Sequence, residues 1–330
     1  LAAILYTSGT TGRSKGAMLS HGNLASNALA LVEAWRFTEK DVLIHALPVY
    51  HTHGLFVATN TLLLSGGRML FRRKFDGDDV MRLMPQATSL MGVPTFYTRL
   101  LQHPGLTRES VQHMRLFISG SAPLLAETHK EFSARTGHAI LERYGMTETS
   151  MNTSNPYDGD RRAGTVGMPL PHIAVRVADP QTHAPLPAET DGMIEVKGPN
   201  VFKGYWRNPQ KTAEDFTSDG WFITGDMGRI SADGYVTISG RAKDLVITGG
   251  FNVYPKEIEL VIDFRRSAAV TRPRVRPYSS WTKARWIEDP RNSSMASSAG
   301  MVSGITGTVV TSLSNSSLRR SSRTSATSFT

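Results

Sequence analysis

The sequence predicts an α/β fold, with a largely parallel sheet in the first part of the chain and a smaller antiparallel β subdomain after it. Short apolar runs alternate with segments of helical spacing over residues 1–136, as in proteins built from βαβ units. From residue 164 to residue 240 the apolar runs become short and alternating, separated by Pro, Gly, Asp and Asn. After about residue 260 neither pattern continues, so the fold class rests on residues 1–259.

The individual elements follow from local patterns. Residues 1–6 predict a short buried strand that leads into a Ser/Gly/Thr loop, and Ser20 is expected to cap an amphipathic helix that carries Leu24, Leu31 and Trp35 on one face. The later elements are expected to be a strand at 41–47, a helix after Gly54, a strand at 68–71, a helix at 78–84, a strand at 88–92, a helix at 95–102, a strand at 116–119 and a helix at 124–136. The runs HIAVRVAD, GMIEVKG and GYVTISG predict antiparallel strands.

The composition is that of a globular protein without a signal for export or membrane insertion. The chain has 330 residues, of which 40% are hydrophobic, and no cysteine, which excludes disulfides, thiolate catalysis and Cys-ligated zinc. No apolar stretch reaches the ~18 residues of a membrane span, and the first residues lack the basic flank of a signal peptide. We therefore expect a cytoplasmic protein without a membrane span.

The net charge of +9 is concentrated in the last part of the chain. Residues 261–330 contain 11 Lys/Arg and 3 Asp/Glu, which leaves residues 1–260 at +1. A basic tail could bind nucleic acid or an acidic membrane, but its aromatic residues, Tyr278, Trp281 and Trp286, have no strand or helix to present them. We therefore expect no nucleic-acid partner.

The stretch YTSGTTGRSKG (6–16), directly after the first expected strand, predicts a phosphate-binding loop. Its glycines let successive backbone N–H groups converge on an anion, its hydroxyls add donors, and Lys15 adds a positive charge. The stretch does not fit GxxxxGK[ST], which disfavours a P-loop NTPase.

Several separated stretches carry a resemblance to one family. They are YTSGTTGRSKG (6–16), PVYHTHG (48–54), SGSAPL (119–124), ERYGMTE (142–148), GWFITGDMG (220–228) and GRAKDLVITGGFNVYPKEIE (240–259). On these stretches the chain resembles the acyl-CoA synthetases of the adenylate-forming superfamily. Within that superfamily it is most similar to malonyl-CoA synthetases, on PVYHTHGLF, MGVPTFYTRLL, SGSAPL and YGMTETSMNTSNPYDGDRRAGTVGMPLP.

The resemblance implies the adenylate-forming fold and a division of the chain. Residues 1–163 would form part of an α/β AMP-binding domain, and 164–240 an antiparallel β subdomain. Residues 241–260 would be a hinge and the start of a small C-terminal α+β domain. Residues 261–330 would be a basic Ser/Arg-rich tail that is aberrant or disordered.

The resemblance also implies a ligase reaction in two steps. A carboxylate attacks the α-phosphate of ATP to give an acyl-AMP and pyrophosphate, and the thiol of CoA then displaces AMP. ATP and Mg²⁺ are the implied cofactors, CoA is the co-substrate, and the acid is expected to be malonate, in the context of fatty acid metabolism.

The resemblance assigns roles to individual residues. The catalytic group would be Thr147, Glu148 and Lys15, with Glu148 and Thr10 as magnesium ligands, Lys243 as the hinge, and Gly249 and Gly250 beside the pantetheine arm of CoA. The nucleotide would be held by Thr7, Ser8, Gly9, Thr10, Thr11, Gly12, Gly120, Ser121, Ala122, Glu142, Arg143, Tyr144, Gly145, Asp226 and Arg241. The chemistry of these residue types agrees: a Glu oxygen is a hard ligand for a cation that shields phosphate charge, and a Tyr ring can stack on adenine. An Asp carboxylate can accept hydrogen bonds from both ribose hydroxyls.

Selectivity for malonate requires a partner for its second carboxylate, since a buried unpaired charge is costly and a planar arginine fork matches a carboxylate best. By resemblance, Arg99 and Ser121 would hold this carboxylate and His51 or His53 would line the pocket. Arg99 lies among apolar neighbours on an expected helix, which favours an inward-facing side chain; the alternative is a solvated helix arginine. His51 and His53 alone do not indicate a metal site, because no third ligand lies nearby in sequence.

Both ends depart from the family pattern. The chain begins at the strand before the phosphate loop, so we expect the family's upstream α/β portion to be missing. The family also carries a late lysine in a Gly-Lys stretch; after Lys256 the only lysine is Lys283, without such a stretch, and we do not assign it that role. A shifted reading frame after about residue 260 is our hypothesis for the change in composition.

Three functional hypotheses therefore follow from the sequence. The first is an ATP-dependent malonate–CoA ligase, impaired by the missing lysine. The second is a ligase for methylmalonate or another small carboxylate. The third is a nucleotide-binding remnant without catalysis.

Overall fold

The computed structural model describes residues 1–7, 14–244, 246–248 and 251–253, with side chains up to residue 244. Six of the expected phosphate-loop residues, Ser8, Gly9, Thr10, Thr11, Gly12 and Arg13, lie outside the described residues, as do Gly249, Gly250, Lys283 and the whole expected tail.

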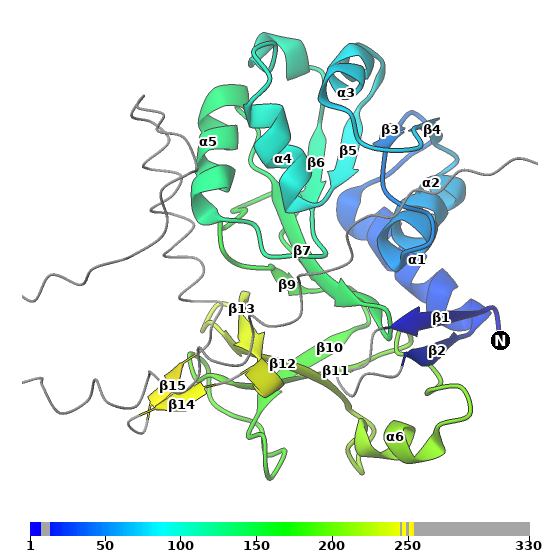
Figure 1. Cartoon of the computed structure of the whole chain (residues 1–330), viewed down its shortest axis with the longest axis vertical. Helices are drawn as coiled ribbons and strands as arrows, with labels where there is room; N and C mark the ends of the chain where they lie inside the picture. Colours follow the sequence, from blue (N-terminus) through cyan, green and yellow to red (C-terminus); the bar gives the residue numbers. More distant parts are fainter. Residues whose placement is uncertain (8–13, 245, 249–250, 254–330) are drawn as a thin grey trace, which may run out of the picture. The chain divides into compact units, whose positions relative to one another are not determined.

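The larger sheet has seven strands in the order β4-β3-β5-β6-β7-β8-β9. Its first five strands are parallel, and β8 and β9 are antiparallel additions at one edge. This mixed sheet with helices around it confirms the predicted α/β class (Figure 1). The strands are β3 (Val42–His45), β4 (Arg68–Phe71), β5 (Ser89–Gly92), β6 (Leu116–Ser119), β7 (Leu141–Met146), β8 (Ser150–Ser154) and β9 (Met168–Pro169).

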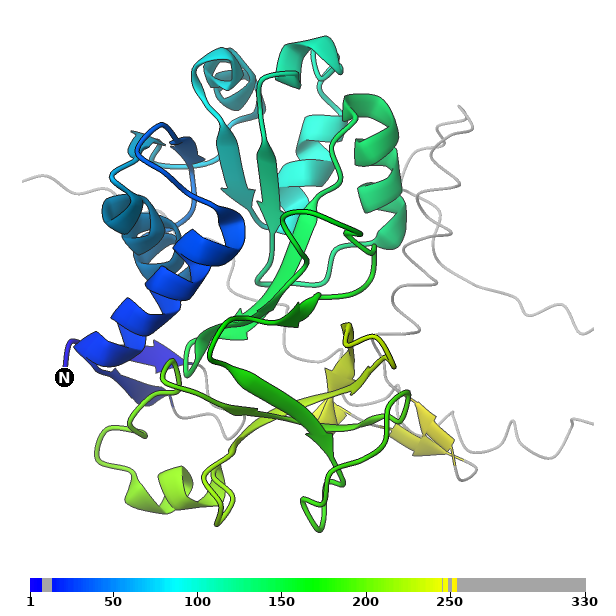
Figure 2. The same cartoon turned by 180° about the vertical axis from the view of Figure 1, so that it is seen from behind.

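Side chains cap the first turns of three of the described helices, α1 at Ser20, α3 at Asp76 and α6 at Asn208. Ser20 caps α1 as predicted, because its hydroxyl accepts a hydrogen bond of 3.1 Å from the backbone N–H of Asn23, whose side chain accepts in return from Ser20 N–H. Helix α4 lies in front of the parallel strands in Figure 1 and behind them in Figure 2. The helices are α1 (His21–Trp35), η1 (His53–Ala58), α2 (Thr59–Ser65), α3 (Gly77–Leu83), η2 (Met84–Gln86), α4 (Pro94–Leu101), η3 (Glu109–Val111), α5 (Ala126–Thr136), α6 (Pro209–Glu214) and η4 (Ala242–Asp244).

A second sheet contains four antiparallel strands in chain order: β10 (Ala174–Ala178), β11 (Gly192–Lys197), β12 (Phe222–Ile230) and β13 (Val236–Arg241). They lie in the part of the chain whose alternating runs predicted antiparallel strands. Two hairpins stand apart from both sheets, β1 (Ala3–Thr7) with β2 (Lys15–Leu19), and β14 (Val246–Thr248) with β15 (Phe251–Val253).

The expectation of a buried strand at residues 1–6 is wrong. Among the described strands, β1 pairs with β2 alone and is half-buried along most of its length, with the Tyr6 side chain exposed. An apolar run of six residues does not distinguish a central strand from a hairpin strand that covers the core on one side, which is the physical reason for the error.

One apolar core joins the two sheets. Leu90 and Ile118 of the larger sheet and Ile194, Phe222 and Val236 of the smaller sheet belong to the same buried cluster. Strands β3, β6 and β7 point their carboxyl ends toward the second sheet, so the segments after them meet at one edge, where parallel sheets bind ligands.

Candidate active site

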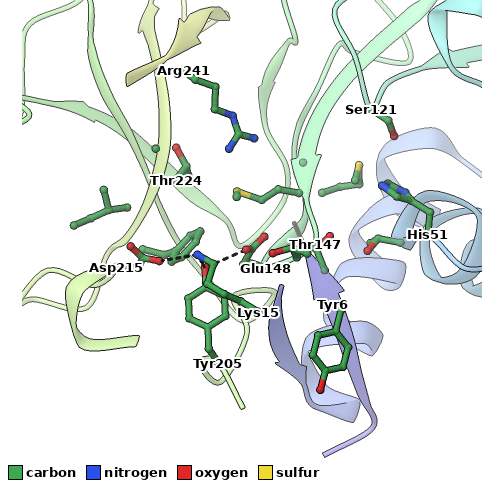
Figure 3. A pocket seen from close by; sticks show the side chains of 18 of the residues that line it. Tyr6, Lys15, His51, Ser121, Thr147, Glu148, Tyr205, Asp215, Thr224 and Arg241 are labelled. Atoms are coloured by element: carbon green, nitrogen blue, oxygen red, sulfur yellow. Dashed lines mark hydrogen bonds and ion pairs between the residues drawn. The ribbon is translucent and has the colours of Figure 1, made fainter. Parts of the chain in front are cut away.

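Two adjoining cavities lie at this edge. The first, of about 660 Å³, is named here the Lys15 cavity and draws side chains from β2, the segment after β3, the β7–β8 turn and the second sheet (Figure 3). The second, of about 700 Å³, is named the Asp226 cavity and lies between the segment after β6 and strands β7, β12 and β13. Ser121, Arg143, Gly145 and Arg241 line both, so the cavities adjoin at these residues.

The cavities bring together most of the described residues that the sequence singled out. The Lys15 cavity is lined by Thr7, Lys15, His51, Ser121, Arg143, Gly145, Thr147, Glu148, Arg241 and Lys243. The Asp226 cavity is lined by Ser121, Ala122, Glu142, Arg143, Tyr144, Gly145, Asp226 and Arg241. Gly120 lines neither but lies against the Arg143 guanidinium, where a Cβ would come within 2.4 Å of Cζ.

Arg99 lies away from both cavities, and the expectation that its side chain faces inward is wrong. Its side chain is exposed on α4 and lies over the Phe75 ring, with Cζ 4.7 Å from the ring centroid, and it lines neither cavity. Phe96, Tyr97 and Leu100 form the buried face of α4. Arg99 borders that face without belonging to it, so one side of its guanidinium stacks on the Phe75 ring while the residue stays exposed to water.

A chain of polar contacts crosses one wall of the Lys15 cavity. Lys15 Nζ donates to Tyr205 Oη at 3.2 Å, and Tyr205 Oη donates to Glu148 Oε1 at 3.0 Å. Lys15 Nζ also lies 3.7 Å from a carboxylate oxygen of Asp215 (Figure 3). Lys211 Nζ lies 2.8 Å from the other carboxylate oxygen of Asp215. Burial raises the pKa of Glu148, and Lys15 opposes this rise only in part. A bound cation would favour the charged form of this buried carboxyl.

Arg143 lies between the two cavities and is buried without an ion-pair partner among the described residues. The residue is 3% exposed, and its Nε and Nη2 have no hydrogen-bond partner among the described residues. Burial therefore lowers the pKa of this guanidinium to about 9. A cavity beside a buried positive charge of this kind is suited to an anionic ligand.

His53 and Ser121 lie beside Arg143. His53 is buried, and its Nδ1 shares a hydrogen bond of 3.1 Å with Ser121 Oγ. Burial and the nearby Arg143 charge lower the pKa of His53 well below its usual value, so the ring is neutral at pH 7. Ser121 has a φ of 69°, which non-glycine residues rarely adopt, and this backbone directs its hydroxyl to the ring.

Asp226 is the anionic group of the second cavity. It accepts hydrogen bonds from Tyr144 Oη at 2.5 Å and from Arg241 Nε at 2.7 Å. Burial raises the pKa of Asp226, while Arg241 and Tyr144 act in the opposite direction. A ligand with two hydroxyls can replace either partner, because a carboxylate has about four acceptor positions.

The β7–β8 turn presents Thr147 and Glu148 and depends on Gly145. A Cβ at Gly145 would lie 1.9 Å from the carbonyl oxygen of Ser150, so the two strands approach too closely here for any other residue. The ladder is also irregular between Tyr144 and Gly145. The glycine thus fixes the position of the turn between the cavities.

The sequence did not indicate Tyr205, Asp215, Lys211 or Met151 as site residues, yet all four line the Lys15 cavity. Tyr205 and Asp215 come from the segment around α6, far from Lys15 in sequence. Strand β2, which pairs with Tyr205 through Ala17, was itself not predicted, so no local signal could have found this contact.

Comparison with known proteins decides the family. Residues 1–206 match the family described as AMP-binding enzyme. The chain belongs to this AMP-binding enzyme family. It is 39% identical over 279 residues to a malonate–CoA ligase of Arabidopsis thaliana, and the match covers 78% of this chain and 45% of that relative. A mitochondrial malonate–CoA ligase of mouse is also 39% identical, and that match covers 78% of this chain and 50% of the relative.

Solved structures of AMP-binding enzymes agree with this. The ATP-bound MatB of Rhodopseudomonas palustris is 72% identical with a TM-score of 0.78, over 80% of this chain and 52% of that one. A malonyl-CoA ligase with methylmalonyl-CoA and AMP bound is 44% identical with a TM-score of 0.68, over 76% and 55%. The fold is therefore that of adenylate-forming enzymes, as expected.

The chain spans about half the length of the relatives it matches. Within the described residues, no helix is long and apolar enough to cross a bilayer.

Proposed function

We propose that this chain is the malonate-activating part of an ATP-dependent acid–CoA ligase, which converts malonate, CoA and ATP to malonyl-CoA, AMP and pyrophosphate. The observation that carries the proposal is the pair of adjoining cavities. One contains an anionic ribose-type acceptor, Asp226, and the buried cation Arg143 lies between the two. The 72% identity to an ATP-bound MatB supports the same substrates.

We assign the second carboxylate of malonate to Arg143 and no longer to Arg99. The Arg143 guanidinium lines the cavity and has no ion-pair partner among the described residues, which favours a carboxylate ligand, and Ser121 adds a hydroxyl. The neutral His53 ring adds no competing positive charge and orients the serine. The reacting carboxylate would then lie toward Thr147, on the same cavity wall.

Adenosine is assigned to the Asp226 cavity. Asp226 and Arg241 would hold the ribose hydroxyls, and Tyr144 offers the ring for adenine. The phosphates would extend into the Lys15 cavity toward Lys15 and Thr147. This arrangement would orient the nucleophile and the α-phosphate at the junction of the two cavities, and such positioning is the main contribution of a protein to phosphoryl chemistry.

The residues fit a magnesium ion that is held mainly by ATP. No cluster of three or more His, Cys, Asp or Glu in the described residues could form a complete metal site. Glu148 nevertheless supplies one buried carboxylate in the Lys15 cavity, and Mg²⁺ is commonly bound by one or two carboxylates together with substrate phosphates. When bound, the ion would neutralise phosphate charge, and Glu148 would hold it.

Product analysis tests the proposal and separates it from the alternatives. AMP and pyrophosphate are measured with malonate, methylmalonate or acetate, with and without CoA, beside ATP binding. We expect product formation with malonate, faster with CoA. A preference for methylmalonate would contradict the assigned substrate, and ATP binding without products from any acid would identify a nucleotide-binding remnant. The cytoplasmic location stays a prediction, since several similar ligases are named as mitochondrial.

A further inference from the structure

We propose that Tyr205 is a positioning residue whose hydroxyl separates the Lys15 ammonium from the Glu148 carboxylate and fixes the orientation of both. The inference rests on the proposed function, because it concerns how Glu148 would hold the magnesium of ATP. Tyr205 lies outside every motif by which the sequence indicated the site.

The direction of both hydrogen bonds is determined by chemistry. A lysine ammonium can only donate and a carboxylate can only accept, so the hydroxyl accepts from Lys15 Nζ at 3.2 Å and donates to Glu148 Oε1 at 3.0 Å. Both bonds of the hydroxyl are therefore used. The Lys15 ammonium also lies over the Tyr205 ring, 4.3 Å from its centroid, which holds the lysine on one side of the ring (Figure 3).

The tyrosine is rigidly held between the two groups that it joins. Its ring packs edge-on against Phe202 at 4.8 Å between centroids. The backbone N–H of Trp206 donates to Gly16 O at 2.7 Å, next to Lys15. The backbone N–H of Phe202 donates to Glu148 O at 2.8 Å. The segment 202–206 thus fixes the distance between strand β2 and the β7–β8 turn.

The consequence is a constraint on the Glu148 carboxylate. Among the described side chains only Tyr205 donates a hydrogen bond to Glu148, and it does so at Oε1. Because Glu148 also lines the Lys15 cavity, the hydroxyl restricts how this carboxylate is oriented there. Without the hydroxyl, Glu148 and Lys15 would attract each other directly, and the resulting ion pair would compete with a cation for the carboxylate.

The test is the Tyr205→Phe variant, which keeps the ring and its packing and removes only the hydroxyl. The control is Tyr235→Phe, because the Tyr235 hydroxyl donates to the Asp160 carbonyl outside both cavities. ATP binding to the full 330-residue chain is measured by calorimetry with Mg²⁺ and again with EDTA. Thermal melting of each variant confirms folding.

We expect Tyr205→Phe to weaken Mg²⁺-dependent ATP binding by about tenfold, as for other residues that orient a metal ligand, and to change binding in EDTA by less than about threefold. The loss should disappear in a Glu148→Gln background, since the hydroxyl acts through that carboxylate. An ATP affinity of Tyr205→Phe that changes equally with and without Mg²⁺, or that does not change, overturns the proposed role of Tyr205. In that case, ATP binding by the unaltered chain leaves the proposed function intact. If the unaltered chain does not bind Mg²⁺–ATP, both fail.

Discussion

Replacement of Arg143 by methionine is the sharpest perturbation of the proposed acid pocket. Methionine has a similar length and no charge, so the cavity wall keeps an unbranched side chain and loses its only buried unpaired guanidinium among the described residues. Malonate should then lose the partner of its second carboxylate. A monocarboxylate such as acetate has no second carboxylate and should be little affected.

The size of the effect follows from the burial of Arg143. Its pKa of about 9, against an ordinary 12.5, corresponds to roughly 5 kcal/mol of unfavourable burial, at 1.36 kcal/mol for each pH unit. A carboxylate paired with it would recover much of this, and removal of one partner of a buried pair typically costs about 3–5 kcal/mol. The dissociation constant of malonate should therefore rise between about 100-fold and a few thousand-fold.

The assay is calorimetric titration of malonate and acetate in the presence of a non-hydrolysable ATP analogue, which needs no turnover. Arg99→Met is measured in parallel, because that arginine was the sequence-based candidate and the structure puts it on the exposed side of α4. Arg143→Met should lose malonate binding and Arg99→Met should retain it. Malonate binding within about threefold of the original in Arg143→Met, with a loss in Arg99→Met, would refute the reasoning.

Three further predictions concern stability and the nucleotide. Gly145→Ala should lower the free energy of unfolding by about 1–3 kcal/mol, as overpacking does, because the new Cβ would collide with Ser150 O. Urea denaturation measures this loss, and an unchanged midpoint would contradict the prediction. Asp226→Asn should weaken ATP binding by about tenfold or more, because an amide can accept fewer hydrogen bonds from the ribose hydroxyls; equal affinity in calorimetry would remove Asp226 from the ribose site. Burial lowers the pKa of His45, so this neutral ring contributes stability that is present above the unfolded pKa of about 6.5 and is lost as the pH falls from there toward the lower folded pKa. His45→Gln should therefore flatten the dependence of the unfolding free energy on pH between about 7.5 and 5.5, by up to about 1.4 kcal/mol per pH unit. Parallel curves for the variant and the original chain would argue against this role of His45.

The sequence predicted elements with strong local signals. The Ser20 cap, strand 68–71 and strand 116–119 agree with α1, β4 and β6, because capping and short apolar runs between turns are local properties. Strands β2 and β8 were not indicated, since they are held by pairing with β1 and β7. Their own residues contain too few apolar positions for a clear period.

Arg99 and Arg143 show how far the candidate site could be predicted from the sequence. Arg99 and Arg143 both have apolar neighbours in sequence, and an arginine is rarely buried, so a helix position beside aromatic residues was the natural choice. Arg143 lies in central strand β7, where Leu141, Glu142 and Arg143 are all buried and no alternation marks the inward face. Gly120, 23 positions earlier, leaves the space for its guanidinium, and this relation exists only in three dimensions.

The central claim is that malonate attacks the α-phosphate of ATP in this chain, and isotope transfer tests it most directly. Malonate labelled with ¹⁸O in its carboxylates is incubated with ATP, Mg²⁺ and CoA, and AMP is analysed by mass spectrometry. The acyl-AMP retains one carboxylate oxygen on phosphorus when the thiol displaces AMP, so the account predicts one ¹⁸O in each AMP together with an equal amount of malonyl-CoA. AMP without the label, or no AMP although ATP is bound, would contradict it.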